Sequence, residues 1–326
     1  MAYRMIFMGS DPIALPALNA IWEGECGDIE LLAIYTQPDR PRGRGKKVAP
    51  NEIKTWALER GLPVHQPEKM RKEQRLEIEA MQLDSILVMA FGHLLSQKLI
   101  ETPRYGIWNL HTSLLPKYRG ASPIQCAVAS GDAETGVSLM EMVREMDAGP
   151  VLDVEKVSIE AEDTALDVEA KLSAACVPLL RRGLPLIHRG EATSLPQDES
   201  QVSFVRKLGK EDGELDFRVE GRELAKRING LFPWPGARAR LGDLVIKIGL
   251  ATWDEADCSG QPGEVLDLES RGLKVACGTG SVFLKRLQRP GGKMLDAADF
   301  MRGFELPEKS VFESKQMPPL VTRDGR

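Results

Sequence analysis

The first half of the chain alternates short apolar runs with amphipathic segments. The apolar runs, which predict strands, are residues 4–8, 30–36, 63–66, 85–90, 106–111 and 139–143. The segments that predict helices are residues 13–24, 50–60, 71–81 and 163–177. The run at 85–90 is apolar at nearly every position, which is typical of a strand covered on both faces. Strands that alternate with helices predict a doubly wound, mostly parallel sheet.

The pattern changes past residue 189. Residues 190–212 are rich in Glu, Ser, Gln, Lys and Gly, which predicts a linker. Short strands separated by glycine turns are then predicted at 244–251, 263–268, 272–277 and 281–287. Such spacing favours a small β-barrel. We therefore expect an α/β domain over 1–189, a linker over 190–212 and a β-barrel domain over 213–326.

Composition agrees with two globular domains and excludes several classes of protein. The chain has 326 residues, 42% of them apolar and 28% charged. No run of about 18 uncharged apolar residues predicts a membrane span, and the N-terminus lacks the features of a signal peptide. Five scattered cysteines without a C-x-x-C pair, and four unclustered histidines, predict neither disulfides nor a bound metal. We expect a cytoplasmic protein without membrane contacts.

One short segment reverses the acidic character of the chain, whose net charge is −5. Residues 38–47 contain one acid and five basic residues: Arg40, Arg42, Arg44, Lys46 and Lys47. Basic residues in a Gly/Pro-rich loop are suited to binding phosphates. A solvated surface loop is the alternative interpretation.

Candidate polar groups follow several of the predicted strands. Ligands of open α/β sheets bind outside the carboxyl ends of the strands, which would group residues 90–92, Asn109, His111 and the loop after Val143 around one crevice. The first turn, Gly9–Pro12, is not G-x-G-x-x-G, so a nicotinamide cofactor is disfavoured.

The segment 106–125 concentrates the candidate chemistry. Alternate residues of a strand face the same side, so Asn109 and His111 are expected to be adjacent. An amide beside an imidazole can hold a carbonyl oxygen and manage a proton, as acyl transfer requires. A pair of satisfied polar side chains is the alternative. Asp147 lies in a turn just past a predicted strand, expected at the same sheet edge, although an isolated turn Asp is usually structural.

The whole segment 106–125 strongly resembles the signature of the formyltransferases that use 10-formyltetrahydrofolate. Residues 36–47, 131–137 and 232–236 match the same family, closest to its members that act on methionyl-tRNA, and the match is collinear from about Met5 to about Gly292. The resemblance implies a formyltransferase-type, Rossmann-like domain followed by an OB-like β-barrel that binds tRNA. It also implies 10-formyltetrahydrofolate as co-substrate and initiator methionyl-tRNA as partner, and we expect a monomer.

The resemblance assigns roles to individual residues. The residues implied to be catalytic are Asn109, His111 and Asp147. Those implied to bind the folate are Ser113, Leu114, Leu115 and Pro116, with the pterin near Met89, Phe91 and Gly92. The five basic residues of 38–47 are implied to contact tRNA. The chain departs from the family pattern at Pro150, at Phe91 and in the Gly9–Pro12 turn.

The implied reaction is attack of an amine on the formyl carbon of the folate. Asn109 and a protonated His111 would donate hydrogen bonds to the resulting oxyanion, and a nearby Asp147 would stabilise the imidazolium. Whether Asp147, His111 or water takes the proton of the amine stays open.

Two alternatives remain at this stage. A sister formyltransferase acting on glycinamide ribonucleotide or a sugar amine, or the hydrolase of the same co-substrate, would share the Asn–His–Asp set. The basic segment and the C-terminal hundred or so residues favour methionyl-tRNA instead. A noncatalytic RNA-binding protein would be expected to lack at least one of Asn109, His111 and Asp147, and all three are present.

Overall fold

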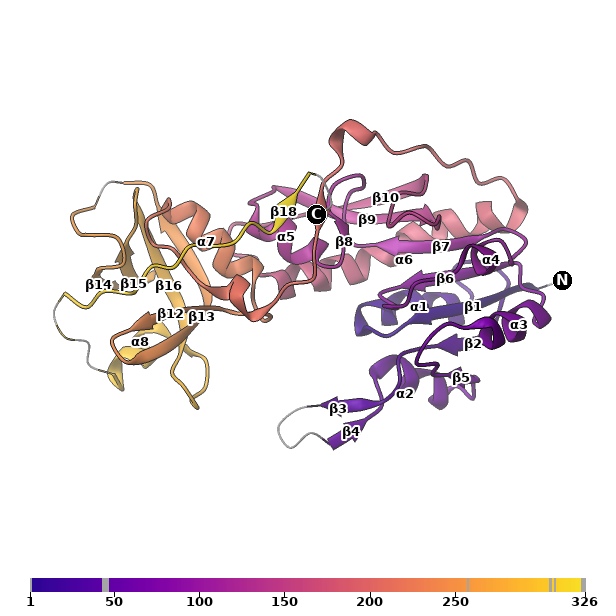
Figure 1. Cartoon of the computed structure of the whole chain (residues 1–326), viewed down its shortest axis with the longest axis horizontal. Helices are drawn as coiled ribbons and strands as arrows, with labels where there is room; N and C mark the ends of the chain where they lie inside the picture. The colour runs from indigo at the N-terminus through magenta and orange to yellow at the C-terminus, as the bar shows by residue number, and fades with distance from the viewer. Residues whose placement is uncertain (1, 43–46, 257, 305–306, 308, 324–326) are drawn as a thin grey trace. The chain divides into compact units, whose positions relative to one another are not determined.

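The chain forms two compact units in a computed structural model that describes residues 2–42, 47–256, 258–304, 307 and 309–323 (Figure 1). Unit 1 comprises the residues up to Arg119 together with Gly136–Val157 and Ala170–Val202. Unit 2 comprises Gly120–Thr135, Ser158–Glu169 and the residues from Ser203 onward. The segment 190–212 is therefore shared, with its first part in unit 1 and its last ten residues, 203–212, in unit 2.

A seven-stranded sheet forms the centre of unit 1, in the order β10-β9-β7-β6-β1-β2-β5. In that order the strands are Val151–Ser158, Glu134–Glu141, Ile107–His111, Ser85–Met89, Tyr3–Gly9, Ile29–Tyr35 and Val64–His65. Strand β1 pairs in parallel with β2 and β6, and the parallel pairing continues to β5 and β7. Strand β9 is antiparallel to β7. The predicted doubly wound, mostly parallel sheet is confirmed.

Helices and a short hairpin complete unit 1. The helices are α1 (Leu15–Trp22), α2 (Glu52–Glu59), α3 (Lys72–Ala80), α4 (Gln97–Ile100) and most of α6 (Ala165–Arg189), with 3-10 turns η1 (Pro12–Ala14) and η2 (Glu199–Gln201). The strands β3 (Arg40–Arg42) and β4 (Lys47–Ala49) form the hairpin. No helix within the described part of the chain is both long and apolar enough to cross a membrane.

Helix α6 extends beyond its predicted end at Val177, through Pro178 and Pro185. A proline inside a helix removes a backbone hydrogen bond and costs about 3 kcal/mol. Burial of the apolar face of α6 offsets this cost. Leu179, Leu180 and Leu184 are all fully buried, and each buried leucine stabilises the fold by about 1.5–3 kcal/mol. The predicted end of this helix was wrong because tertiary packing overrides the local signal.

The last turn of α6 carries a histidine that should make unit 1 sensitive to acid. The His188 ring stacks on Tyr3 with 3.5 Å between ring centroids. Burial lowers the pKa of His188 from 6.5 to about 4, with Asp84 opposing the shift and Arg189 adding to it. The folded state thus binds this proton less readily than the unfolded chain. The stability contributed by neutral His188 is therefore fully present above pH 6.5. It is lost as the pH drops toward 4, and the loss is at most about 3 kcal/mol.

The variant His188→Phe tests this expectation because phenylalanine keeps the ring stack but cannot titrate. We expect the free energy of unfolding, measured with urea, to fall less between pH 7 and pH 4.5 for His188→Phe than for the wild type. The difference should be about 2–3 kcal/mol. An equal decline in both proteins would show that His188 is not the group responsible.

Unit 2 is built on an antiparallel sheet in the order β12-β13-β16-β15-β14, with β17 paired to β16. In that order the strands are Ala237–Leu241, Leu244–Asp254, Ser281–Gln288, Gly272–Ala276 and Val265–Glu269, with β17 at Leu295–Asp296. Four of them correspond to the predicted strands, and the antiparallel architecture confirms that part of the fold prediction. Strand β12 was not predicted, although Arg238 and Arg240 alternate with its buried residues as in a half-buried strand.

Helix α7 (Gly221–Gly230) packs against β13 and supplies Leu224 and Ile228 to the core of unit 2. The remaining elements are α5 (Pro123–Ala129), α8 (Ala297–Arg302), η3 (Lys210–Gly213) and the short strands β8 (Arg119–Gly120), β11 (Phe204–Val205) and β18 (Val321–Thr322). A side chain at Gly120 is excluded, because its Cβ would lie 2.1 Å from the Val205 carbonyl oxygen.

Candidate active site

Strand β7 places Asn109 and His111 on the same face of the sheet, since they are two residues apart in one strand. Asn109 is half-buried and lies between Val88 of β6 and Met140 of β9. His111, the last residue of the strand, is only 6% exposed and lies opposite Ser138. An amide and an imidazole are therefore on one face of the strand, as predicted, and the imidazole is shielded from bulk water.

The two ring nitrogens of His111 have different surroundings. Nε2 lies 3.0 Å from the carbonyl oxygen of Tyr118. A carbonyl can only accept a hydrogen bond, so Nε2 carries the hydrogen. Nδ1 lies 3.8 Å from Oδ2 of Asp147. This arrangement leaves Nδ1 as the ring atom available for proton transfer or for contact with a reacting group.

Asp147 reaches His111 by a path that differs from the predicted one. Because β9 is antiparallel to β7, its last residue Glu141 pairs with Trp108, near the start of β7. The loop after β9 therefore begins at the end of the sheet opposite to the end where His111 lies. It then runs back toward His111 and brings Asp147 beside the ring. The expectation that Asp147 follows a strand ending at the same edge was wrong, although the predicted proximity holds. Asp147 itself has φ +52°, in the left-handed region that costs non-glycine residues energy.

The turn at Ser113–Pro116 is anchored on β9 by a buried serine. Ser138 Oγ donates to the Ser113 carbonyl at 2.7 Å and accepts from Leu115 N at 3.1 Å. Gly136 provides space for this turn, because a Cβ there would lie 2.5 Å from Leu114 Cδ2. The turn is therefore fixed beside His111.

The segment after β6 presents backbone rather than side chains. Met89 is 1% exposed, and Phe91 packs in the core of unit 1 at 3%. Ala90 and Gly92 are exposed, with φ of +49° and +74°. A ligand at this position would consequently meet peptide groups of Ala90 and Gly92, and the phenyl ring of Phe91 would not touch it.

The base of the basic segment is held by polar contacts. Asp39 accepts from Lys54 Nζ at 2.7 Å and from Gln66 Nε2 at 2.8 Å. Gln37 accepts from Arg40 Nη2 at 3.0 Å and donates to the Phe91 carbonyl, also at 3.0 Å. One glutamine thus joins the exposed Arg40 to the strand end at Phe91.

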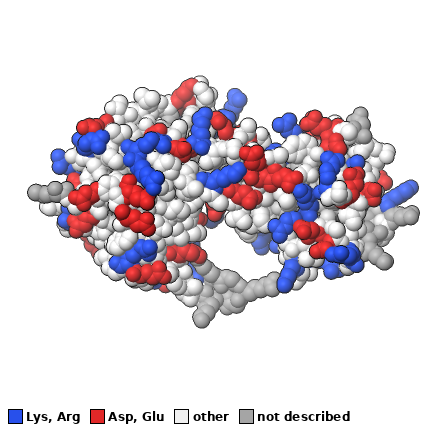
Figure 2. All heavy atoms as spheres, turned by 180° about the vertical axis from the view of Figure 1, so that it is seen from behind, with Lys and Arg blue, Asp and Glu red and all other residues white. Residues whose placement is uncertain are grey.

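The other basic residues are less fully described. The backbones of Arg42 and Lys47 are paired in the β3–β4 hairpin. Arg44 and Lys46 lie outside the described residues. On the face of the molecule shown in Figure 2, basic and acidic side chains are intermixed over both units.

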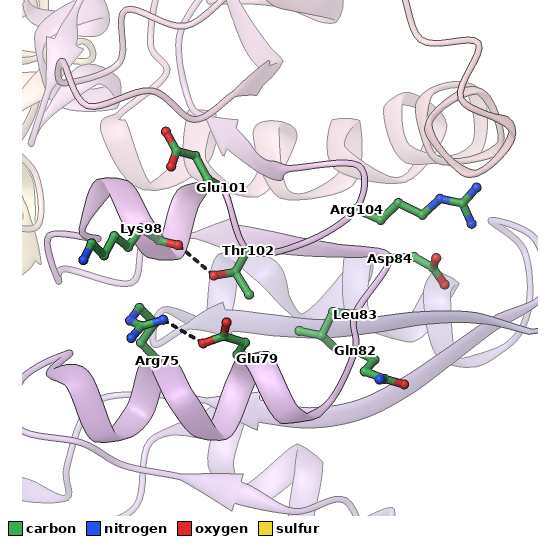
Figure 3. Close-up of a pocket in the computed structure, with 9 residues that line it drawn as sticks. All are labelled: Arg75, Glu79, Gln82, Leu83, Asp84, Lys98, Glu101, Thr102 and Arg104. Atoms are coloured by element: carbon green, nitrogen blue, oxygen red, sulfur yellow. Dashed lines mark hydrogen bonds and ion pairs between the residues drawn. The ribbon is translucent and has the colours of Figure 1, made fainter.

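A cavity of about 680 Å³ in unit 1 lies away from these residues, at the amino ends of β6 and β7 (Figure 3). Its lining carries three acids and three bases, including the Arg75–Glu79 ion pair, and none of the candidate residues. Within the described residues, no group of three or more His, Cys, Asp or Glu side chains could hold a metal ion.

Comparison with known families agrees with this site. Residues 4–182 match the model of the family described as formyl transferase, and residues 207–305 match the formyl transferase C-terminal domain. The chain therefore belongs to the formyl transferase family.

Relatives of this chain include methionyl-tRNA formyltransferases. The protein of that name from Hydrogenovibrio crunogenus is 37% identical over 309 residues, covering 94% of this chain and 98% of the relative. The one from Xylella fastidiosa strain M12 is 39% identical over 300 residues, covering 91% and 96%. An N-formyltransferase from Helicobacter canadensis, solved with folinic acid and dTDP-3-aminofucose, is 16% identical with a TM-score of 0.65, covering 87% of this chain and 99% of its own.

Proposed function

We propose that the protein transfers the formyl group of 10-formyltetrahydrofolate to the free amino group of initiator methionyl-tRNA, giving N-formylmethionyl-tRNA for translation initiation. The observation that carries the proposal is the placement of His111 Nδ1 3.8 Å from Asp147 Oδ2, with Asn109 on the same face of β7. We place the enzyme in the cytoplasm, as a monomer. The methionyl-tRNA formyltransferases that match over more than nine-tenths of this chain support the choice of acceptor.

We assign the catalytic roles to residues that the geometry brings together. The amine attacks the formyl carbon and loses a proton, and the bond from that carbon to N10 of the folate then breaks as N10 takes up a proton. Asn109 Nδ2 and Nδ1 of a protonated His111 donate to the oxyanion that forms, while the Asp147 carboxylate orients the ring and stabilises its positive charge. The amine must be neutral to attack, and an α-amino group has a pKa of about 7.7–8.0, so only a weak base is needed.

The folate contacts are assigned to two backbone segments. The turn Ser113–Pro116 supports the co-substrate with Leu114 and Leu115, and the pterin lies against the segment from Met89 through Phe91 to Gly92. The described residues fit such a ligand, because the exposed peptide groups of Ala90 and Gly92 can pair with the polar edge of a flat heterocycle. Ser138 holds the first segment in place.

The experiment that tests the function is formyl transfer from 10-formyltetrahydrofolate to initiator methionyl-tRNA. Uncharged tRNA, elongator methionyl-tRNA and glycinamide ribonucleotide serve as parallel acceptors. Transfer to the charged initiator alone supports the proposal. Transfer only to the small amine, or release of formate without an acceptor, would keep the Asn–His–Asp chemistry but reject the acceptor. Absence of folate binding would favour a noncatalytic RNA-binding protein.

The tRNA contacts are assigned to the basic residues at 38–47 and to unit 2. We expect Arg42→Ala or Arg44→Ala to raise KM for tRNA several-fold with kcat for bound substrate nearly unchanged. Because each phosphate contact releases counterions, the slope of log K against log salt should become shallower by about 0.7–0.9 per lost contact. Salt titrations of tRNA binding measure this slope, and Arg104→Ala, at an exposed position of unit 1 just before the amino end of β7, serves as the control. An unchanged slope would remove the segment from the tRNA interface.

A further inference from the structure

The loop that carries Asp147 is held by a side chain from the segment that the sequence suggests is only a linker. Gln197 Nε2 donates to the carbonyl oxygen of Asp147 at 2.8 Å and to that of Gly149 at 2.7 Å. Both amide hydrogens of Gln197 are thereby used on the turn. From these contacts we propose that Gln197 is a positioning residue, which holds Asp147 beside His111 for the formyl transfer proposed above.

The orientation of the Gln197 amide is fixed by its other end. Oε1 accepts from Arg119 Nε at 3.0 Å and from Arg119 Nη2 at 2.9 Å. A guanidinium can only donate and a carbonyl can only accept, so a single orientation of the amide satisfies all four hydrogen bonds. Arg119 is 4% exposed and also pairs with Glu199 at 2.7 Å, so the anchor for Gln197 is itself rigid.

The same network touches His111 from the other side. Arg119 directly follows Tyr118, whose carbonyl accepts from His111 Nε2 at 3.0 Å. Gln197 therefore links two segments. One is Arg119, which follows the residue whose carbonyl orients the His111 ring, and the other is the turn that carries Asp147. Leu195 pairs with Val151 through two backbone hydrogen bonds of 2.8 Å, which fixes the segment close to the turn.

The turn needs such support for two reasons. Asp147 has φ +52°, and a non-glycine residue pays energy for that conformation unless its surroundings hold it. The separation of 3.8 Å between Asp147 Oδ2 and His111 Nδ1 is longer than a hydrogen bond, so the pair itself restrains the turn weakly. Misplacement of a catalytic group by about 1 Å can cost about 10²-fold in rate.

The variant Gln197→Glu isolates this function because it has the same shape. A carboxylate at 197 keeps the contacts to Arg119 but offers only acceptors to the carbonyls of Asp147 and Gly149. We expect kcat for formyl transfer to fall about 10- to 100-fold, with KM for folate and for tRNA changed less than about threefold. Gln201→Glu is the matched control, because the same change is made at an exposed position whose amide donates to Asp198, and it should keep wild-type kcat.

Two further readouts separate positioning from general damage. In an Asp147→Ala background, Gln197→Glu should lower kcat less than about threefold, because the group that it positions is already gone. Independently of turnover, NMR chemical shifts of the His111 ring at fixed pH should move in Gln197→Glu toward those of Asp147→Ala. Gln197→Asn, which changes no charge, replaces Gln197→Glu if the latter fails to fold.

Each outcome decides the proposal. A loss of kcat that disappears in the Asp147→Ala background, with the shift of the His111 signals, supports it. Wild-type kcat in Gln197→Glu, an equally large loss in the Asp147→Ala background, or unmoved His111 signals overturns it. If the wild type formylates no acceptor, the proposed function fails, and the NMR comparison still decides the role of Gln197.

Discussion

Replacing His111 with alanine is expected to lower kcat for formyl transfer by about 10²- to 10³-fold and to leave the Kd for tRNA nearly unchanged. The ring is buried, its Nε2 is committed to the Tyr118 carbonyl, and its Nδ1 is the nitrogen that remains beside Asp147. Removing one donor to a developing oxyanion typically costs about 2.7–4 kcal/mol in the barrier. Single-turnover formylation of saturating methionyl-tRNA, together with filter binding of tRNA, measures the two effects separately.

The control for this experiment is His65→Gln. His65 lies in the edge strand β5, which β6, β1 and β2 separate from β7, and its ring stacks on Tyr35. We expect that variant to keep wild-type kcat. Asn109→Ala should resemble His111→Ala, because it removes the second donor on the same face of β7. Near-normal turnover in His111→Ala would show that the proposed mechanism is wrong.

Much of the site could be predicted because it depends on neighbouring residues of one strand. The two-residue period of a strand is enough to place Asn109 next to His111, and the turn at Ser113–Pro116 follows immediately in sequence. The proximity of Asp147 was predicted from the family motif. Its path could not be, because the pattern at 139–143 does not reveal whether a strand is parallel or antiparallel to its neighbour.

The supporting residues could not be predicted for a different reason. Gln197 lies in a polar segment where nothing distinguishes it from Gln201, since only the fold brings it to the Asp147 turn. The sequence gives a weak indication of the role of Ser138, because it is a polar residue within an apolar run. Such residues usually make a buried hydrogen bond. The assignment of residues 190–212 as a linker between two domains stays a prediction.

Unit 2 contains a buried carboxylate whose loss should strongly reduce stability. Asp212 is fully buried and accepts from Arg206 Nη1 at 2.8 Å, from Arg206 Nη2 at 2.6 Å and from Gly209 N at 2.7 Å. We expect Asp212→Ala to lower the free energy of unfolding of unit 2 by about 3 kcal/mol, the low end for a broken buried ion pair. The low end applies because the Arg206 side chain is 47% exposed and can be rehydrated. Hydrogen exchange of the β13 and β16 amides under native conditions measures the change.

The loss of stability in Asp212→Ala should come from removing a buried carboxylate and not from breaking an ion pair as such. Asp299→Ala breaks the exposed pair with Arg302 and should cost less than about 1 kcal/mol. Burial raises the pKa of Asp212, but the hydrogen bonds from Arg206 and Gly209 outweigh it, so the pKa lies below its ordinary value. The contribution of Asp212 is therefore present above about pH 4 and is lost as the pH falls further. Asp212→Asn, which retains an acceptor without the charge, should abolish that acid-dependent part, whereas similar losses in Asp212→Ala and Asp299→Ala would contradict the assignment.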